Sequence, residues 1–169
     1  MALFPRWTNT VARLTGALAL GAPLVVAGFL LLLARTPLFT RQHVEVEQPV
    51  PFDHRQHAWA QGIDCLYCHG GAERSAAAGV PPASTCAGCH TQAPLPVDAP
   101  IPWAKVHDLP DFVYFDHSIH FAKGVGCATC HGKVEEMARV VQAAPLTMSW
   151  CLDCHRERHA RTACDACHR

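Results

Sequence analysis

A short pattern of cysteine and histidine occurs five times between residue 65 and the end of the chain. We number the copies in chain order as motifs 1 to 5: Cys65, Cys68 and His69; Cys86, Cys89 and His90; Cys127, Cys130 and His131; Cys151, Cys154 and His155; and Cys164, Cys167 and His168. The two thiols of a Cys-x-x-Cys-His unit add across the vinyl groups of one haem, and the histidine ligates its iron. The motifs use all ten cysteines. The sequence therefore predicts five covalent c-type haems.

The alternative interpretation of Cys-x-x-Cys is a zinc ribbon or a redox-active dithiol. Neither site requires a histidine directly after the second cysteine, and histidine makes up only 12 of the 169 residues. Zinc ribbons also combine their Cys-x-x-Cys units in pairs, whereas this chain has an odd number of units. The pattern favours haem attachment.

Six-coordinate haem irons also need distal ligands, and a repeated histidine pair is the main source. Residues 52–57 (FDHRQH) are echoed 63 residues later by residues 115–120 (FDHSIH). Aspartate suits a helix N-cap and the following Gly62 and Gly124 suit helix ends, so each pair should lie on a short helix. Histidines at positions i and i+3 share one helix face, so one pair can serve two haems. We predict these distal ligands: His54, His57, His117 and His120.

The fifth distal ligand has two main candidates. Met148 lies three residues before Cys151, and methionine sulfur is an axial ligand that raises the potential of a haem. Its alternative role is to fill a gap beside a porphyrin. His107 is the other candidate, and it could instead hydrogen bond to a haem propionate. His43 and His159 are weaker alternatives, and we predict Met148.

The repeated pairs and motifs divide the haem-binding part of the chain. One dihaem module covers about residues 50–92, a second covers about 111–156, and residues 157–169 carry the fifth haem. Together they form a haem domain at 51–169. Porphyrin faces supply the apolar bulk of such a domain, so we expect a mainly irregular fold with short α-helices whose core is the five haems.

Several connecting segments have patterns of their own. Five prolines, at positions 94, 96, 100, 102 and 110, predict an extended linker between the modules. Apolar Trp103, Val106 and Leu109 indicate that this linker is packed rather than free. The spacing of apolar residues predicts an amphipathic helix over 133–144. A shorter helix is expected over 73–78, ended by Gly79.

The N-terminal part of the chain is apolar. Residues 14–34 contain no charged side chain, which is enough helix to span a bilayer core of about 30 Å. The alternative is a cleaved signal peptide, but its apolar region is usually shorter and is followed by a small-x-small cleavage site. We therefore expect a cytoplasmic N-terminus at 1–13, a transmembrane signal anchor at 14–34 and a polar tether at 35–50. Because c-type haems are attached outside the cytoplasmic membrane, the haem domain should be periplasmic.

Charge excludes one class of partner. The formal net charge is zero at pH 7, and the haem propionates would lower it to about −5 in the fully oxidised protein. The chain has no basic run and no alternation of basic and aromatic residues, so nucleic acid is not an expected partner.

The unit FDHxxH followed by Cys-x-x-Cys-His resembles class III multihaem cytochromes c. Three further segments are similar to the pentahaem cytochrome c subunit of bacterial alternative complex III: 79–86 (GVPPASTC), 106–112 (VHDLPDF) and 145–151 (PLTMSWC). With the anchor, the resemblance covers most of the chain. It implies a membrane-bound electron-transfer subunit that has no substrate chemistry of its own. It also implies an iron–sulfur subunit as donor, multispanning quinol-binding subunits as neighbours, and a periplasmic cytochrome c or terminal oxidase as acceptor.

Two other functions share some of these features. A self-contained, membrane-anchored quinol dehydrogenase has the same anchor and haems, and would oxidise quinol without partners. A multihaem reductase for nitrite or a similar substrate needs an open coordination site on one iron. The surplus of candidate distal ligands argues against the reductase.

Overall fold

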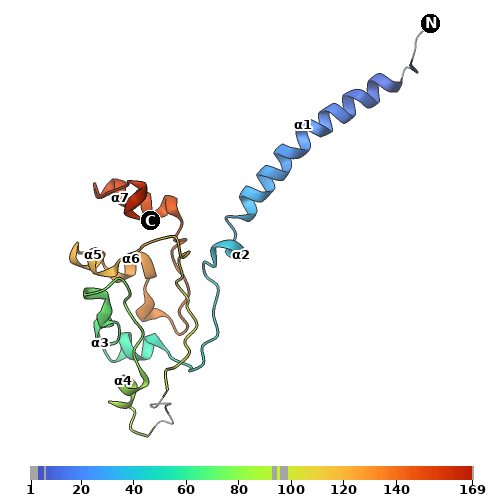
Figure 1. Cartoon of the computed structure of the whole chain (residues 1–169). Coiled ribbons are helices and arrows are strands. Elements are labelled where there is room, and N and C mark those ends of the chain that lie inside the picture. The colour runs from blue at the N-terminus through green and yellow to red at the C-terminus, as the bar shows by residue number, and fades with distance from the viewer. Residues whose placement is uncertain (1–3, 6, 93–94, 96–98, 169) are drawn as a thin grey trace. The chain divides into compact units, whose positions relative to one another are not determined.

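The computed structural model describes residues 4–5, 7–92, 95 and 99–168, and the chain divides into two compact units (Figure 1). The first unit is Met1–Arg41 and the second is Gln42–Arg169. The predicted haem domain falls within the second unit. Pro94 and Pro96 of the predicted linker lie outside the described residues.

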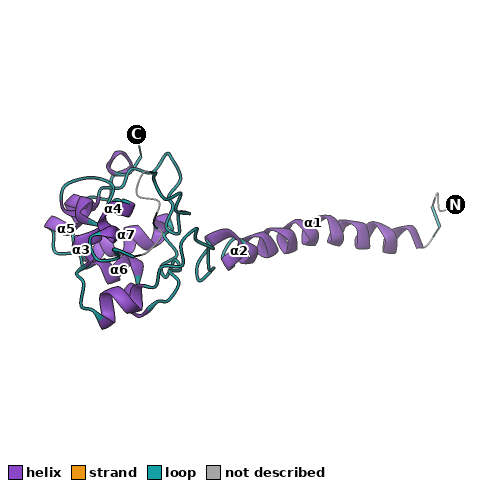
Figure 2. Cartoon of the chain, turned by 90° about the horizontal axis from the view of Figure 1, so that it is seen from below, coloured by secondary structure: helices purple, strands orange, loops and turns teal. Residues whose placement is uncertain are grey.

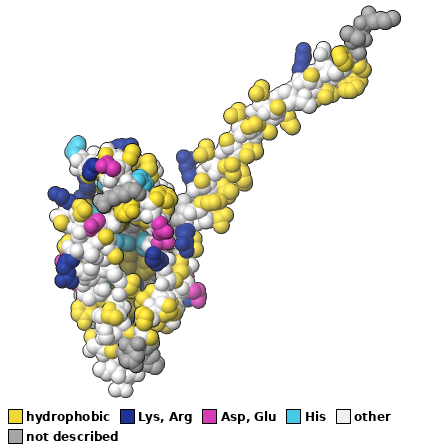
Figure 3. Space-filling view, viewed as in Figure 1, with side chains coloured by type: hydrophobic (Ala, Val, Ile, Leu, Met, Phe, Trp, Pro, Cys, Tyr) yellow, Lys and Arg dark blue, Asp and Glu magenta, His cyan; other side chains and the backbone are white. Residues whose placement is uncertain are grey.

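The first unit contains the long apolar helix α1, Trp7–Leu33, and the single turn α2, Pro37–Thr40. Helix α1 begins seven residues before the predicted span and has a mean hydropathy of 2.3 in its most apolar window. Hydrophobic side chains are spread along its exposed surface (Figure 3). It is long and apolar enough to cross a membrane, a property that an N-terminal signal sequence shares.

The second unit consists of short helical turns joined by irregular segments (Figure 2). In chain order they are η1 (Arg55–Ala60), α3 (Cys65–Cys68), η2 (Gly70–Glu73), α4 (Ala83–Ala87), α5 (His117–Ala122), α6 (Cys127–His131), η3 (Val134–Glu136), α7 (Met148–Glu157) and η4 (Cys164–Ala166). In the described residues, β-pairing is limited to one bridge between Gln42 and Gln142. The predicted fold of short helices and irregular chain is confirmed.

The second unit has almost no protein core. Among the described residues, the buried apolar side chains are Ala83, Ile101 and Ala144, and no large side chain is fully buried. Aromatic residues such as Trp59 and Tyr67 are more than half exposed. A unit of this size cannot be stable with so little buried apolar surface. Large apolar groups other than side chains must fill it.

The predicted helix over 133–144 is wrong. The chain makes one 3₁₀ turn, η3, which ends at an extended Met137, and residues 138–144 contain bends and one β-bridge but no helix. Gln142 pairs in parallel with Gln42, and the His43 N–H donates to the Gln142 carbonyl at 2.9 Å. Adjacent β-branched Val140 and Val141 suit extended backbone better than helix. Pairing with the tether therefore overrides the helical spacing of the apolar residues.

The predicted helix over 73–78 is also wrong. The helical turn η2 ends at Glu73, and the following carbonyls point to another segment. Ala76 and Ser75 accept hydrogen bonds from the N–H groups of His117 and Ser118, at 3.3 and 3.2 Å. These carbonyls serve helix α5 and so are not available within a helix of their own.

Residues 42–50 of the tether and the described part of the linker make contacts within the second unit, to which they belong. The Gln48 side chain donates to the Ala104 carbonyl at 2.9 Å and accepts from the Ala104 N–H at 3.0 Å. Arg139 forms ion pairs with Glu45 and Glu47. Ile101 is buried, so the part of the linker that the structure describes is packed, as its apolar residues indicated.

Candidate haem sites

Each Cys-x-x-Cys-His motif lies on or beside one helical turn. The histidine N–H bonds back to the carbonyl of the first cysteine in motifs 1, 2 and 5, at 2.8, 2.9 and 2.9 Å. Motifs 3 and 4 lie inside α6 and α7. A turn brings cysteines at i and i+3 to the same side, as one porphyrin requires. None of the ten cysteines forms a disulfide.

Three motif histidines each face one histidine of the repeated pairs. The ring centroids are 5.9 Å apart for His57 and His90, 6.2 Å for His117 and His131, and 6.1 Å for His120 and His155. Two imidazoles that each bind one metal ion at about 2 Å, with ring centres about 1 Å behind the nitrogens, have centroids about 6 Å apart. The centroid separation in all three pairs equals the one expected for two imidazoles that bind a common metal ion.

Hydrogen bonds fix which nitrogen these rings can offer to iron. In six histidines Nδ1 bonds to a backbone carbonyl, which only accepts, so Nδ1 carries the proton and Nε2 keeps its lone pair. The acceptors are Gly79 for His69, Arg161 for His155, Phe112 for His168, Asp53 for His57, Ala76 for His117 and Asp116 for His120, at 2.7–3.1 Å. The donor set therefore fits haem iron, as does the lack of a protein core.

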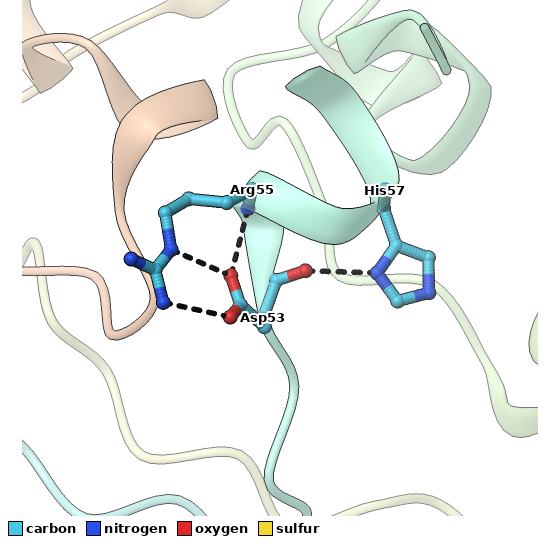
Figure 4. Close-up of polar contacts among 3 residues, drawn as sticks. All are labelled: Asp53, Arg55 and His57. Carbon is cyan, nitrogen blue, oxygen red and sulfur yellow. Dashed lines mark hydrogen bonds and ion pairs between the residues drawn. The ribbon is translucent and has the colours of Figure 1, made fainter. Parts of the chain in front are cut away.

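Asp53 and Asp116 each organise their histidine pair in two ways. The Asp116 carboxylate caps α5 by accepting from the Ser118 N–H at 2.8 Å, and the Asp53 carboxylate accepts from the Arg55 N–H at the same distance. The Asp53 backbone carbonyl also accepts from His57 Nδ1 at 2.9 Å (Figure 4). Helix η1 differs from the expected regular helix, because Arg55–Ala60 is wound as a π-helix.

The glycines after each pair have the expected conformation. Gly62 and Gly124 have φ values of +67° and +69°, in the left-handed region that favours glycine. The Gly124 N–H closes the last turn of α5 by donating to the Phe121 carbonyl at 2.9 Å. The sequence therefore located both ends of α5, with Asp116 as its N-cap. In the first pair, η1 begins at Arg55 and its N-cap is His54 instead of the expected Asp53.

His54 and His107 are buried in part and have ring nitrogens without a partner in the described residues. These atoms are His54 Nδ1 and His107 Nε2. Burial lowers the pKa of both rings, and His69 is the next cause for His54. His54 is therefore close to motif 1, which, like motif 5, has no motif histidine in a ring pair with another histidine.

His107 lies edge-on to His131, with ring centroids 4.3 Å apart. This separation is too short for two rings on opposite sides of one iron. Burial, followed by His107, His117 and His69, lowers the pKa of His131 to about 4. His131 is consequently neutral at physiological pH, which is the form of imidazole that binds metal.

Met148 begins helix α7, whose first turn is capped by Thr147. The Met148 side chain is 67% exposed, so protein packing does not hold its sulfur away from a cofactor. The motif 5 histidine, His168, is anchored to the Phe112 carbonyl at 3.1 Å, and the Tyr114 N–H bonds to the Cys167 carbonyl at 2.8 Å. Motif 5 therefore packs against the segment that leads into the second histidine pair.

Electrostatic interactions between cysteines indicate which motifs are neighbours. After burial, the next cause that raises each thiol pKa is a cysteine of another motif: Cys86 for Cys68, Cys127 for Cys65, Cys151 for Cys130 and Cys167 for Cys151. Cys65 and Cys127 are also within hydrogen-bonding distance. The motifs thus follow one another in space in the order 2, 1, 3, 4, 5.

The sequence analysis did not identify Phe52 and Phe115 as part of the site. Each ring packs against both histidines of its own pair. The signal was present, because both copies of the repeat begin with phenylalanine at the same offset. The carbonyl acceptors Gly79, Ala76 and Arg161 could not have been found, since any residue type supplies a carbonyl.

Comparisons with known proteins agree with this geometry. Residues 113–169 match the family described as cytochrome c7 and related cytochrome c. The chain is also 32% identical over 98 residues to the multihaem cytochrome c subunit of menaquinone reductase from Nitratidesulfovibrio vulgaris, strain Hildenborough. That match covers 50% of this chain and 46% of the relative, so the chain spans about half of the relative's length. The motifs, the site geometry and both comparisons together show a likeness to multihaem cytochromes c, which the family match places at residues 113–169.

Proposed function

We propose that the chain is a membrane-anchored electron wire that carries five c-type haems and has no substrate chemistry of its own. Electrons pass along haems bound at motifs 2, 1, 3, 4 and 5, in that spatial order or its reverse. The two ends of the path are then motif 2, in the first module, and motif 5, at the C-terminus. The haem irons, when bound, would supply one-electron chemistry between the ferric and ferrous states, and the motif and distal histidines would hold them.

The observation that carries this proposal is the set of three histidine pairs spaced at about 6 Å. In this set, the short helix α5 supplies distal ligands for two haems, because it presents His117 to motif 3 and His120 to motif 4. Helix η1 presents His57 to motif 2, and His54 is the remaining candidate for motif 1. Two haems bound by histidines of one short helix would lie close together, as rapid electron transfer needs.

The join between the two modules supports a continuous path. His117 of the second module hydrogen bonds through Nδ1 to Ala76, between motifs 1 and 2, at 2.7 Å. Cys65 of motif 1 lies within hydrogen-bonding distance of Cys127 of motif 3. A wire composed of two modules needs this contact, since either module alone would end in an isolated pair of haems.

The wire is proposed to work within a respiratory complex in the cytoplasmic membrane, with its haem domain in the periplasm. Residues 14–34 would be the anchor, an iron–sulfur subunit the donor and a periplasmic cytochrome c or oxidase the acceptor, as in alternative complex III. Oxidation of one quinol at a neighbouring subunit releases two electrons and two protons. The electrons would cross the wire one at a time, and the protons would leave at the quinol site.

The relative favours a second candidate, in which electrons move in the other direction. Its name describes a complex that reduces menaquinone. The same wire would then take electrons from a periplasmic donor and deliver two of them, one at a time, for each menaquinone reduced. The haem path is unchanged, and only its terminal partners exchange roles.

Purification from native membranes with a mild detergent, followed by redox assays, tests the proposal. We expect the chain to co-purify with an iron–sulfur protein and multispanning subunits. A reduced menaquinol analogue should reduce the haems of that complex and not those of the separated chain. Haem reduction in the separated chain would instead establish a self-contained quinol dehydrogenase.

Two further results of the same preparation would change the assignment. If the chemically reduced complex passes electrons to a menaquinone analogue faster than it takes them from the quinol, the direction is that of the relative. A stoichiometric high-spin ferric signal in the intact complex, together with nitrite reduction, would make the chain a reductase.

A further inference from the structure

Phe52 and Phe115 make the same pair of contacts in the two modules. Phe52 meets His54 edge-on, with centroids 4.8 Å apart and planes at 86°, and stacks on His57 at 4.2 Å and 28°. Phe115 meets His117 edge-on at 4.8 Å and 89°, and stacks on His120 at 4.4 Å and 26°. Each phenylalanine ring thus touches two imidazoles that are turned across one another.

These contacts act on rings whose other constraint is a single hydrogen bond or none. His57 and His120 are held at Nδ1 by the carbonyls of Asp53 and Asp116. One hydrogen bond fixes an edge of an imidazole but allows the ring to rock about that bond. A flat aromatic face against the ring removes this freedom, and an aliphatic side chain of similar volume would not.

His54 depends most on its phenylalanine. Its Nδ1 is buried and has no hydrogen-bond partner in the described residues, so the orientation of this ring rests on packing. In the second module His117 has the Ala76 carbonyl in addition. The phenylalanine contact is therefore expected to affect ring orientation more at His54 than at His117.

The angle between the two imidazole planes differs among the three pairs of facing histidines. His117 lies within 8° of parallel to His131, whereas His57 and His90 are tilted by 48° and His120 and His155 by 45°. Stacking on phenylalanine goes with the tilted pairs, and the edge-on contact goes with the parallel pair. One ring thereby couples two different ligand geometries.

We propose that Phe52 and Phe115 are positioning residues, each of which sets the axial-ligand planes of two haems at once. The inference rests on the proposed ligation by the histidine pairs. In low-spin ferric haem, the angle between two axial imidazole planes determines how far the iron d orbitals split, and second-shell groups tune the metal through ligand orientation. Parallel planes give a rhombic electron paramagnetic resonance signal, and crossed planes give a more axial one with a larger maximum g value.

The wild-type spectrum should therefore contain both classes of signal. The haem at motif 3 is assigned the rhombic signal, and the haems at motifs 2 and 4 are assigned more axial signals. Phe115 controls one haem of each class, at motifs 3 and 4. Phe52 controls the haem at motif 2 and the haem that His54 would ligate, at motif 1.

The test compares the variants Phe115→Leu and Phe52→Leu with the matched control Phe121→Leu, in the full chain with its haems. Phe121 lies on α5 but makes no ring contact with an imidazole in the described residues. Equal haem content by mass and absorbance shows that a variant has matured. Phe115→Leu should shift the maximum g values of two signals, one rhombic and one more axial, or convert part of these haems to high spin.

The signals of the other haems should keep their g values in Phe115→Leu. Phe52→Leu should instead shift the signals of the haems at motifs 1 and 2. Phe115→Tyr, which keeps the flat ring, should restore the wild-type spectrum. A Phe115→Leu spectrum that superimposes on the wild type, or an equal change at every haem including those of the control, would overturn the inference. The variant His120→Ala tests the ligation itself, separately from the role of the phenylalanines. If this variant keeps every low-spin signal, the proposed ligation by the histidine pairs is wrong.

Discussion

The imidazole rings of His117 and His131 lie 6.2 Å apart and within 8° of parallel. The two residues come from different helices, α5 and α6, and His117 is held at Nδ1 by the Ala76 carbonyl of the other module. Burial lowers the pKa of His131 to about 4, so it is neutral and able to bind metal. Both histidines belong to the second module, and the hydrogen bond from His117 to Ala76 connects the pair to the first module.

Replacing a distal histidine should open one iron and leave the others intact. His57→Ala, His117→Ala and His120→Ala each remove one of two facing imidazoles, so each variant should convert one low-spin ferric haem to a high-spin or water-ligated form. Electron paramagnetic resonance counts the change. His159→Ala is the matched control, because that exposed histidine has no ring contact in the described residues. Low-spin spectra that are unchanged in all three variants would contradict the ligand assignment.

The sequence was sufficient to predict the haem motifs, the two short histidine helices and the mainly irregular fold. Each of these follows from local chemistry: Asp116 caps the nearest N–H groups, and Gly124 takes the left-handed conformation next to the helix it ends. The pairing of particular histidines needs contacts across the chain. His57 and His90 are far apart in sequence, and only the fold brings their rings to 5.9 Å.

The two helix predictions that were wrong failed for a common reason. Both segments 73–78 and 133–144 give their backbone groups to distant partners, through the Ala76 carbonyl to His117 and through Gln142 to the tether. Apolar spacing reports which side chains face inward, but it does not report whether a carbonyl is needed elsewhere. In both segments these long-range backbone bonds take the place of the expected helical bonds.

The mature polypeptide should carry five covalent haems. The reason is that every motif forms a turn with both cysteines on one side, and no cysteine is taken up by a disulfide. Intact-mass spectrometry of protein from a host with the haem-attachment system measures the number directly. Cys164→Ser combined with Cys167→Ser should lower it by one. Four or fewer haems on fully matured wild-type chains would disprove the prediction.

Gly132 should be sensitive to substitution. It ends α6 directly after motif 3 with φ +71°, and a Cβ there would lie 2.7 Å from the Ala143 Cβ. Gly132→Ala should lower the free energy of unfolding by about 1–3 kcal/mol, measured by guanidinium unfolding of the detergent-solubilised chain.

The control for this change lies on the other side of motif 3. Gly126 has φ −67° and open space around a Cβ. Gly126→Ala should therefore change stability little. Equal effects of the two alanine variants would show that the left-handed backbone and the close contact at Gly132 do not matter.

Met148 is predicted to be the fifth distal ligand, so that one haem has histidine–methionine ligation. A thioether ligand raises the haem potential relative to a second imidazole, so this haem should have the highest potential and lie late in the path. Met148→His should keep the iron low-spin and lower one potential in a redox titration. If the titration of the variant overlays that of the wild type, His107 becomes the better candidate, and His107→Ala should then produce one high-spin haem.

Residues 14–34 are predicted to remain in the mature protein as a transmembrane helix that packs against other membrane subunits. An uncharged helix satisfies its backbone hydrogen bonds internally and is therefore stable in lipid, and α1 continues through this segment to Leu33. Gly16, Gly21 and Gly28 have open space around a Cβ, which allows a neighbouring helix to approach closely. Replacing all three by leucine should leave the chain in the membrane fraction but weaken its co-purification with partner subunits. N-terminal sequencing should begin before residue 14, and a mature chain that begins near Arg35 and is released by a salt wash would show a cleaved, soluble cytochrome instead.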